Sequence, residues 1–267
     1  MDDDRTAFND PDTVEARRRS FGAGAANYDA VRPRWPEPTV DWLLGSPGAP
    51  VRVLDLGAGT GLGTRTIAAL GHEVTAVDPS AEMLAALEAA SVALPHDVGS
   101  RITTRVGRGE ELDVPDASYD VVTCFQAWHW VDPDLAGPDC ARVVRPGGGL
   151  ALAWNSWSDR QPWLRELADI VGTPEMVWDA ERHGATTTEE VTRIDGFGAP
   201  ENTQLGLEQT LTVDELVRLA SSWSPVAVNP ERDAVLEQVR ALGELVAGDD
   251  PTLVFGYVSD CWRYRRR

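Results

Sequence analysis

The chain contains no lysine, only three cysteines and only four histidines among its 267 residues. Cys124, Cys140 and Cys261 form no Cys-x-x-Cys pair, which argues against a disulfide framework and against a zinc site. The histidines are too dispersed to predict a metal site, so we expect no metal. No apolar run is long enough to span a bilayer, and the acidic start Met-Asp-Asp-Asp-Arg is unlike a signal peptide. We therefore expect a reduced, cytoplasmic protein with no membrane partner.

Positive charge is also scarce. The chain has 24 basic residues, all of them arginine, against 43 acidic ones, and its formal net charge is -19. Nucleic acids and anionic membranes are bound through basic surface, so this excess of acids disfavours both as partners. The one dense basic run consists of Arg263, Arg265, Arg266 and Arg267, which we interpret as a solvated tail.

The segment that says most about the function of the chain covers residues 51–66. An apolar run passes through Asp55 and then breaks into glycines at positions 57, 59, 61 and 63. The apolar residues predict a buried strand of a parallel sheet. The glycines predict a turn where a ligand can approach the backbone closely. The segment from 60 to 70 then predicts a helix that stops at Gly71.

A second acid follows the next predicted strand, residues 73–77. Asp78 stands about 20 residues past the glycines, where a carboxylate can bind two ribose hydroxyls. A dinucleotide site needs Gly-x-Gly-x-x-Gly, and position 62 is not glycine. Asp55 would also repel a pyrophosphate, whereas it suits a ligand with a sulfonium and an ammonium group. We favour the sulfonium ligand and keep a nicotinamide or flavin dinucleotide as the alternative.

Strand and helix patterns alternate over residues 36–156, which predicts a doubly wound parallel sheet. Further strands are predicted at 102–106, 119–125 and 150–154. A helix over 133–143 links the last two and ends at the breaker Arg145-Pro146-Gly147-Gly148-Gly149. Beyond these, we predict a helix over 159–171 and strands at 204–211 and 252–259. In an open parallel sheet the ligand binds at the carboxyl ends of the strands, which places these motifs around one crevice.

Several of these segments resemble one known family. They are the glycine stretch, Asp78-Pro79-Ser80-Ala81-Glu82-Met83-Leu84, Val106-Gly107-Arg108-Gly109-Glu110-Glu111-Leu112, Phe125-Gln126-Ala127-Trp128-His129-Trp130-Val131-Asp132 and Tyr28-Asp29-Ala30-Val31-Arg32-Pro33. The pattern is similar to class I S-adenosylmethionine-dependent methyltransferases, in the small-molecule branch that includes trans-aconitate methyltransferase-like enzymes. The resemblance covers residues 20–156. The third segment departs from the family pattern, with Gly109 in place of an alanine and Asp113 in place of a proline.

The resemblance implies an α/β fold: a Rossmann-like, doubly wound, seven-stranded, mostly parallel sheet with an antiparallel closing strand. It implies a helical N-terminal cap over residues 1–35 and a methyltransferase domain over 36–267, with 157–200 as a lid or insert on the substrate side. The cofactor would be S-adenosyl-L-methionine, leaving as S-adenosyl-L-homocysteine. The residues expected to bind it are Tyr28, Arg32, Asp55, Gly57, Ala58, Gly59, Gly61, Asp78, Pro79, Met83, Gly109, Glu110, Phe125 and Gln126.

Methyl transfer from a sulfonium is an in-line displacement, so the protein mainly has to align the reactants and exclude water. His129 is the candidate general base, because an imidazole titrates near neutral pH. Gln126 is a second candidate, for orienting the substrate. Ten tryptophans are present, and an aromatic acceptor pocket is predicted from Trp35, Trp128, Trp130 and Trp157, with ordinary core packing as the alternative for each.

The leading interpretation is therefore S-adenosylmethionine-dependent methylation of a small molecule at oxygen, carbon or nitrogen. The first alternative is a non-catalytic protein that binds S-adenosylmethionine. The second is a nicotinamide-dependent oxidoreductase, against which the glycine spacing argues. The acceptor and the oligomeric state do not follow from the sequence, because this fold supports many chemistries.

Overall fold

The computed structural model of the protein describes residues 29–178, 191 and 193–267. The chain divides into two compact units. The larger unit contains Pro33–Ser158, Trp178–Glu208 and Gly256–Arg267. The smaller unit contains, among its described residues, 29–32, Asp159–Val177 and Gln209–Phe255.

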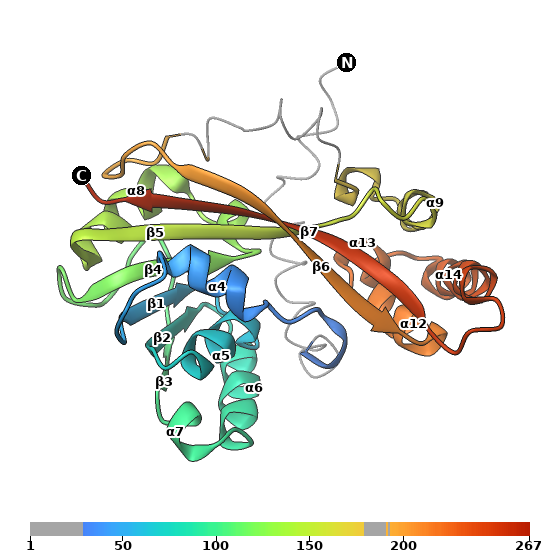
Figure 1. The fold of residues 1–267 in the computed structure, drawn as a ribbon, viewed down its shortest axis with the longest axis horizontal. Helices are drawn as coiled ribbons and strands as arrows, with labels where there is room; N and C mark the ends of the chain where they lie inside the picture. Colours follow the sequence, from blue (N-terminus) through green and yellow to red (C-terminus); the bar gives the residue numbers. More distant parts are fainter. Residues whose placement is uncertain (1–28, 179–190, 192) are drawn as a thin grey trace. The chain divides into compact units, whose positions relative to one another are not determined.

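One seven-stranded sheet runs in the order β3-β2-β1-β4-β5-β7-β6 (Figure 1). Its strands are β1 (Arg52–Leu56), β2 (Glu73–Asp78), β3 (Ile102–Val106), β4 (Tyr119–Phe125), β5 (Val144–Trp157), β6 (Glu201–Leu211) and β7 (Leu253–Arg265). The first five strands pair in parallel, and β7 pairs antiparallel with β5. The predicted fold class is confirmed, including the antiparallel closing strand. The strand order reverses between β1 and β4, which is where an open α/β sheet forms its ligand crevice.

The helices of the larger unit are α4 (Glu37–Leu44), α5 (Leu62–Ala69), α6 (Ala81–Val92), α7 (His96–Gly99), α8 (Pro133–Val143) and the 3-10 turn η1 (Trp128–Trp130). Successive residues of a strand point to opposite faces of the sheet. Val53, Val121 and Ala151 accordingly pack in one apolar cluster, which also holds residues of α4 and α5. Leu54 and Val122 pack in a second cluster, which holds residues of α8. The sheet is therefore covered by helices on both faces, which explains why its central strands are almost wholly apolar.

The smaller unit consists of α9 (Trp163–Val171), the 3-10 turn η2 (Pro174–Met176), α12 (Val213–Ser221), α13 (Ser224–Ala227), α14 (Arg232–Ala247) and the adjoining ends of β6 and β7. A capping box begins α12: the Thr212 hydroxyl accepts from the Glu215 N–H, and the Glu215 carboxylate accepts from the Thr212 N–H. Trp163 meets Phe255 edge to face, with ring centroids 5.5 Å apart. The side chains of Leu164, Leu167, Leu216 and Leu219 are fully buried, so the unit has an apolar centre of its own. The expected helix over 159–171 is confirmed from Trp163 onward.

The helix α8 ends at Val143, as the breaker predicts, and the glycine run after it already belongs to the next strand, which begins earlier than the expected residue 150. β5 begins at Val144 and continues through Gly148 and Gly149. A Cβ at Gly149 would lie 2.5 Å from the carbonyl oxygen of Tyr264, on the antiparallel neighbour β7. Gly149 is therefore needed for the close approach of two backbones, a requirement that a local pattern cannot distinguish from a turn.

The C-terminal arginines also belong to a strand, so the expected solvated tail is wrong. β7 extends to Arg265, and Trp262 and Tyr264 are buried. Arg263 pairs with Glu201 at 2.5 Å, and its guanidinium lies 4.4 Å from the ring centroid of Trp42. The alternation of charged and aromatic residues in this segment is the period-2 pattern of a half-buried strand.

Candidate functional site

The glycine loop between β1 and α5 is held against the end of β2. The N–H groups of Gly57 and Ala58 both donate to the carbonyl oxygen of Val77, at 2.8 and 3.1 Å. Gly59 has a φ of +56°, and a Cβ built on it would meet no heavy atom within 4 Å. Only glycine adopts such a backbone without strain, and the open space beside it leaves room for a ligand.

Asp78, at the end of β2, organises the same loop. One of its carboxylate oxygens accepts from the Gly59 N–H at 2.9 Å, and the other accepts from the Ser80 N–H at 2.8 Å. Its side chain is buried, with the residue only 8% exposed. The predicted ribose-binding acid is thus placed beside the glycine loop and fixed in orientation by two backbone donors.

Asp55 lies below the loop in the interior of the larger unit. Its carboxylate accepts from the hydroxyls of Thr64, in the first turn of α5, and Thr123, in β4, at 2.5 and 2.8 Å. Burial raises the pKa of Asp55 to about 6, against the opposing effect of these two hydrogen bonds. Thr64 lies in α5, so Asp55 acts on the glycine loop through the helix that follows it. Sequence reasoning missed both threonines, since nothing in their local sequence shows that they face an acid.

Thr60 is a further residue that sequence reasoning missed. It lies between Gly59 and Gly61, it is only 2% exposed, and its hydroxyl has no hydrogen-bond partner among the described residues. A buried hydroxyl without a partner costs free energy, so such a group usually has one supplied from outside the chain. Its position in the ligand-facing loop makes it a candidate contact for a bound cofactor.

The second motif begins α6 and packs under the loop. The Ser80 hydroxyl caps the helix by accepting from the Met83 N–H at 3.2 Å. The side chain of Met83 is buried.

In the third motif, the Glu110 carboxylate accepts from the Asp132 N–H at 3.1 Å, which ties this loop to the one after β4. A Cβ at Gly109 would lie 2.9 Å from a terminal methyl group of Leu56, so a larger residue there would need that side chain to shift.

The chain leaves β4 through a strained residue. Gln126 has a φ of +58°, a conformation that costs about 1 kcal/mol or more outside glycine and that clusters at functional sites. Its N–H donates to the Ala153 carbonyl at 2.8 Å, and its side-chain amide donates to the Asn155 carbonyl at 3.2 Å. The buried Asn155 side chain in turn accepts from the Ser259 hydroxyl at 2.6 Å. Asn155 is another residue that the sequence did not single out.

His129 lies in η1, at the carboxyl end of β4. Its Nδ1 accepts from the indole N–H of Trp154, on the neighbouring strand β5, at 3.3 Å. Its ring also meets that of Trp130, with centroids 4.8 Å apart. His129 is exposed, yet the atoms of the surrounding chain partly desolvate its ring and lower the pKa of His129 below its ordinary value. The imidazole is therefore neutral at pH 7.

The four tryptophans of the predicted acceptor pocket differ in environment. Trp35 is 4% exposed and lies against Phe125, with ring centroids 4.8 Å apart. Trp128 is buried in the apolar cluster that also holds Leu54, Val122 and residues of α8, and its indole N–H has no partner in the described part of the chain. Trp157 is also buried, whereas Trp130 is partly exposed. Trp35 and Phe125 thus have packing roles in this structure, and the pocket and cofactor roles assigned to them stay predictions.

The cofactor-binding roles expected of Tyr28 and Arg32 stay predictions. Tyr28 is outside the described residues. Arg32 belongs to the smaller unit, where its guanidinium donates to the hydroxyl and the carbonyl oxygen of Ser222, both at 3.1 Å. The carbonyl oxygen of the preceding Val31 accepts from the Gln209 side chain at 2.9 Å. The structure therefore gives Arg32 a partner of its own within the smaller unit.

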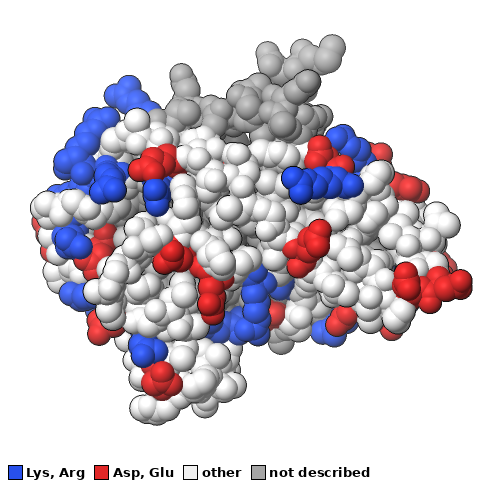
Figure 2. Space-filling view, viewed as in Figure 1, with Lys and Arg blue, Asp and Glu red and all other residues white. Residues whose placement is uncertain are grey.

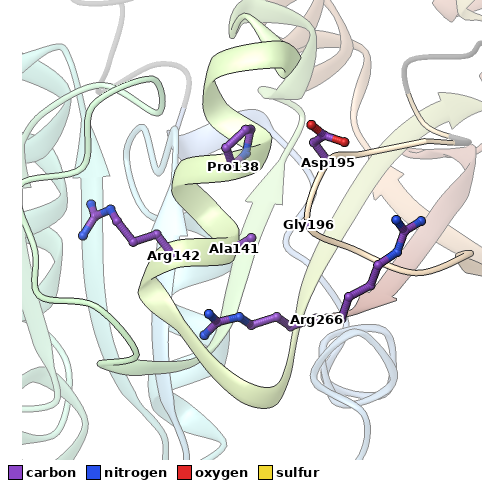
Figure 3. Close-up of a pocket in the computed structure, with 7 residues that line it drawn as sticks. Pro138, Ala141, Arg142, Asp195, Gly196 and Arg266 are labelled. Carbon is purple, nitrogen blue, oxygen red and sulfur yellow. The ribbon is translucent and has the colours of Figure 1, made fainter.

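A separate open cavity of about 450 Å³ lies at the other end of the sheet, beside the C-terminal half of α8 (Figure 3). Arg142 and Arg266 line it together with Asp195. Arg142 is already bonded to Asp139 and Asp116, and the Arg266 guanidinium donates to the carbonyl oxygen of Val144. Arg142 and Arg266, which line this cavity, therefore already have structural partners. None of the residues expected to bind the cofactor or the acceptor lines it.

The charged surface shows no single-sign face in the view of Figure 2, where acidic and basic groups are interspersed. Within residues 29–178, 191 and 193–267, no helix is long and apolar enough to cross a membrane. In the same described part of the chain, no group of three or more His, Cys, Asp or Glu residues is placed to hold a metal ion.

The geometry agrees with what comparison with known proteins shows. Residues 54–152 match the methyltransferase domain family. An uncharacterized methyltransferase of Mycobacterium tuberculosis is 41% identical over 248 residues, covering 91% of this chain and 94% of that protein. An uncharacterized methyltransferase-like protein of Schizosaccharomyces pombe is 32% identical over 218 residues, covering 80% of this chain and 81% of its own length.

The fold has a solved counterpart as well. The structure of a putative type II methyltransferase from Anaeromyxobacter dehalogenans matches with a TM-score of 0.67 and 24% identity, over 88% of this chain and 97% of that one. The relatives named here do not distinguish the trans-aconitate branch, so that detail stays a resemblance. The glycine loop, the acid that organises it and the full-length relatives together lead to one conclusion: this chain belongs to the class I methyltransferase family.

Proposed function

We propose that the protein transfers a methyl group from S-adenosyl-L-methionine to a small-molecule acceptor. The observation that carries the proposal is Asp78, whose buried carboxylate is oriented by Gly59 and Ser80 beside an open glycine loop. A carboxylate at this position binds ribose hydroxyls in related nucleotide sites. The hydroxyl of Thr60 lacks a partner in the same loop, and a bound nucleoside or amino-acid moiety would satisfy it.

When bound, the cofactor would supply an activated methyl group on a sulfonium. The chain's own task is then to hold the reactants in line and exclude water, a contribution of roughly 7–11 kcal/mol in well-aligned reactions. We assign the cofactor to the crevice between β1 and β4, with Asp78 at the ribose, Met83 under the base and the loop of 57–61 alongside. We assign the acceptor to the side formed by Gln126, His129 and Trp130.

The acceptor atom stays open at this level. More distant relatives include a ubiquinone/menaquinone biosynthesis C-methyltransferase of Rubrivivax gelatinosus and a malonyl-[acyl-carrier protein] O-methyltransferase of Methylococcus capsulatus, which match 57% and 50% of this chain. Their names cover both carbon and oxygen as the methylated atom. They support a small-molecule or carrier-linked acceptor for this chain and do not choose between the two atoms.

The test is isothermal titration of the purified protein with S-adenosylhomocysteine. We expect micromolar binding in the wild type and a loss of at least tenfold in Asp78→Asn, since charge-assisted hydrogen bonds contribute about 1.5–3 kcal/mol. Asp120→Asn is the matched control, because Asp120 also accepts a backbone N–H, that of Arg52, but at the opposite edge of the sheet. Thermal melts of both variants verify folding.

Two other outcomes separate the alternatives. Absence of binding in a folded, ligand-free wild-type sample, together with a melting shift on adding NADH, would replace the proposal with the oxidoreductase. Tight binding of the cofactor without release of S-adenosylhomocysteine across a broad acceptor panel would favour the non-catalytic binding protein.

A further inference from the structure

The pairing of His129 with Trp154 decides which ring nitrogen of the histidine carries the proton. An indole N–H can only donate a hydrogen bond, so the Nδ1 atom that receives it from Trp154 must be unprotonated. A neutral imidazole bears one proton, which then resides on Nε2. The free edge of His129 therefore presents a donor, and the lone pair that a general base would need is already occupied.

The neighbours of His129 hold the ring in this orientation. Trp154 lies in β5, directly after Ala153, which is paired with Phe125 of β4. Trp130 covers a side of the imidazole, with the ring planes tilted by 46°. Desolvation lowers the pKa of His129, so the neutral ring predominates at pH 7 and carries its single proton on Nε2.

We propose that Trp154 is a positioning residue that fixes His129 as an Nε2–H donor, and that His129 uses this proton to bind an oxygen of a methyl acceptor that is already an oxyanion, such as a carboxylate. This inference rests on the proposed function. It replaces the expectation that His129 is a general base. An acceptor that is already ionised in solution needs no general base. His129, whose Nε2 carries a proton, is then not required to remove one.

The chemistry balances without a proton transfer. One carboxylate oxygen forms a bond to the methyl carbon, the sulfur–methyl bond breaks with its electron pair passing to sulfur, and a neutral ester and a neutral thioether result. Donation from Nε2 to the other oxygen orients the acceptor. Because the two oxygens share one delocalised charge, this hydrogen bond also lowers the nucleophilicity of the attacking oxygen slightly. His129 therefore contributes to acceptor binding and alignment more than to the intrinsic rate.

The first experiment reads the tautomer directly. Two-bond 15N–1H correlation spectra of the 15N-histidine-labelled protein distinguish a proton on Nε2 from one on Nδ1. We expect the Nε2–H form for His129 in the wild type and a mixture of both tautomers in Trp154→Phe, which keeps the aromatic ring and removes the N–H. A wild-type signal from Nδ1–H, or a mixture unchanged by Trp154→Phe, would overturn the proposal.

The second experiment tests the donor with a matched pair of probes, phenylacetate and 2-phenylethanol, titrated into the protein saturated with S-adenosylhomocysteine. We expect phenylacetate to bind the wild type and His129→Gln, and to bind His129→Leu about tenfold more weakly, because a hydrogen bond to a charged group is lost. 2-Phenylethanol, whose hydroxyl can accept only a weaker, neutral hydrogen bond, should lose clearly less affinity in His129→Leu than phenylacetate does. An amide can donate but cannot accept a proton as a base, so retention in His129→Gln separates the two roles.

Failure of this inference can be told from failure of the proposed function. If phenylacetate binds His129→Leu as well as the wild type, the donor role is wrong even though the cofactor binds. If S-adenosylhomocysteine itself does not bind, the proposed function fails, while the tautomer spectrum still reports on Trp154 and His129.

Discussion

The hydroxyl of Thr123 donates to the buried carboxylate of Asp55 at 2.8 Å, joining β4 to β1 where the strand order reverses. Thr64 donates to the other oxygen, so one acid connects two strands and the first turn of α5. Burial nevertheless raises the pKa of Asp55 to about 6, from an ordinary value of 3.8. Asp55 is therefore a group whose ionisation weakens the fold.

The sign of the pH dependence follows from this shift. Between pH 4 and pH 6 the unfolded chain ionises Asp55 more readily than the folded protein does, so the free energy of unfolding falls as pH rises through this window. A shift of about two pKa units corresponds to a loss of about 3 kcal/mol in the free energy of unfolding across this window. We expect Asp55→Asn to remove this decline in urea unfolding at pH 4, 5, 6 and 7. The control Asp250→Asn, an exposed acid, should keep the wild-type decline, and an unchanged decline in Asp55→Asn would contradict the assignment.

Thr60→Val should separate cofactor binding from stability. The change keeps the shape of the side chain and removes a buried hydroxyl that has no partner among the described residues. We expect the ligand-free protein to be as stable as the wild type or up to about 1 kcal/mol more stable. S-Adenosylhomocysteine should bind more weakly, as measured by calorimetry. Thr60→Ser, which keeps the hydroxyl, should bind normally. A less stable Thr60→Val with normal affinity would mean that the hydroxyl has a structural partner instead.

Two glycines of the same loop should respond differently to alanine. A Cβ at Gly61 would clash with the side chain of Leu87, and its φ is +82°. Gly59 has open space around the added Cβ, so only its backbone conformation resists the change. We expect Gly59→Ala to cost about 1–2 kcal/mol of stability and Gly61→Ala to cost more. Calorimetry on Gly59→Ala should show a loss of cofactor affinity larger than its stability loss explains. Equal effects in melting and binding assays for both variants would show that the open space at Gly59 is not used.

The pair of Arg263 and Glu201 tests whether the C-terminal strand is held by charge. The two groups are 2.5 Å apart and partly exposed, and Arg263 also lies over Trp42. Exposed ion pairs contribute little to stability, so a double-mutant cycle of Arg263→Gln and Glu201→Gln should give only a small coupling free energy. Arg263→Gln alone should cost more than Glu201→Gln, because it also loses the contact with the Trp42 ring and the hydrogen bond to the Trp42 carbonyl oxygen at 3.0 Å. Equal single costs would assign no stabilisation to these two contacts with Trp42.

The strand ends that carry the site were predictable from the sequence. The runs that became β3 and β4 were predicted with the bounds that the structure has, because an apolar run between turn signals is a local pattern. Gly59 and Asp78 were predictable as neighbours for a similar reason. Consecutive parallel strands bring their carboxyl ends to one edge of a sheet, so the spacing along the chain implies proximity.

The contacts between distant residues were not predictable in this way. Trp154 and His129 are 25 positions apart, and neither residue carries a local signal for the other. The same holds for Arg32, whose partner Ser222 is 190 positions away. Trp35 and Trp128 could equally line a pocket or fill a core from sequence alone, since an aromatic residue serves both purposes.

The sequence by itself determined the sheet, the position of the glycine loop and the family to which the chain belongs, because these depend on hydrophobic period, turn residues and spacing. Only the tertiary structure decided what each polar side chain does. It showed that Asp55 bonds two threonines, that Thr60 lacks a partner and that His129 receives a proton donor on Nδ1. The physical reason is that burial and hydrogen bonding belong to the environment that distant segments create together, and no residue carries that environment in its own neighbourhood along the chain.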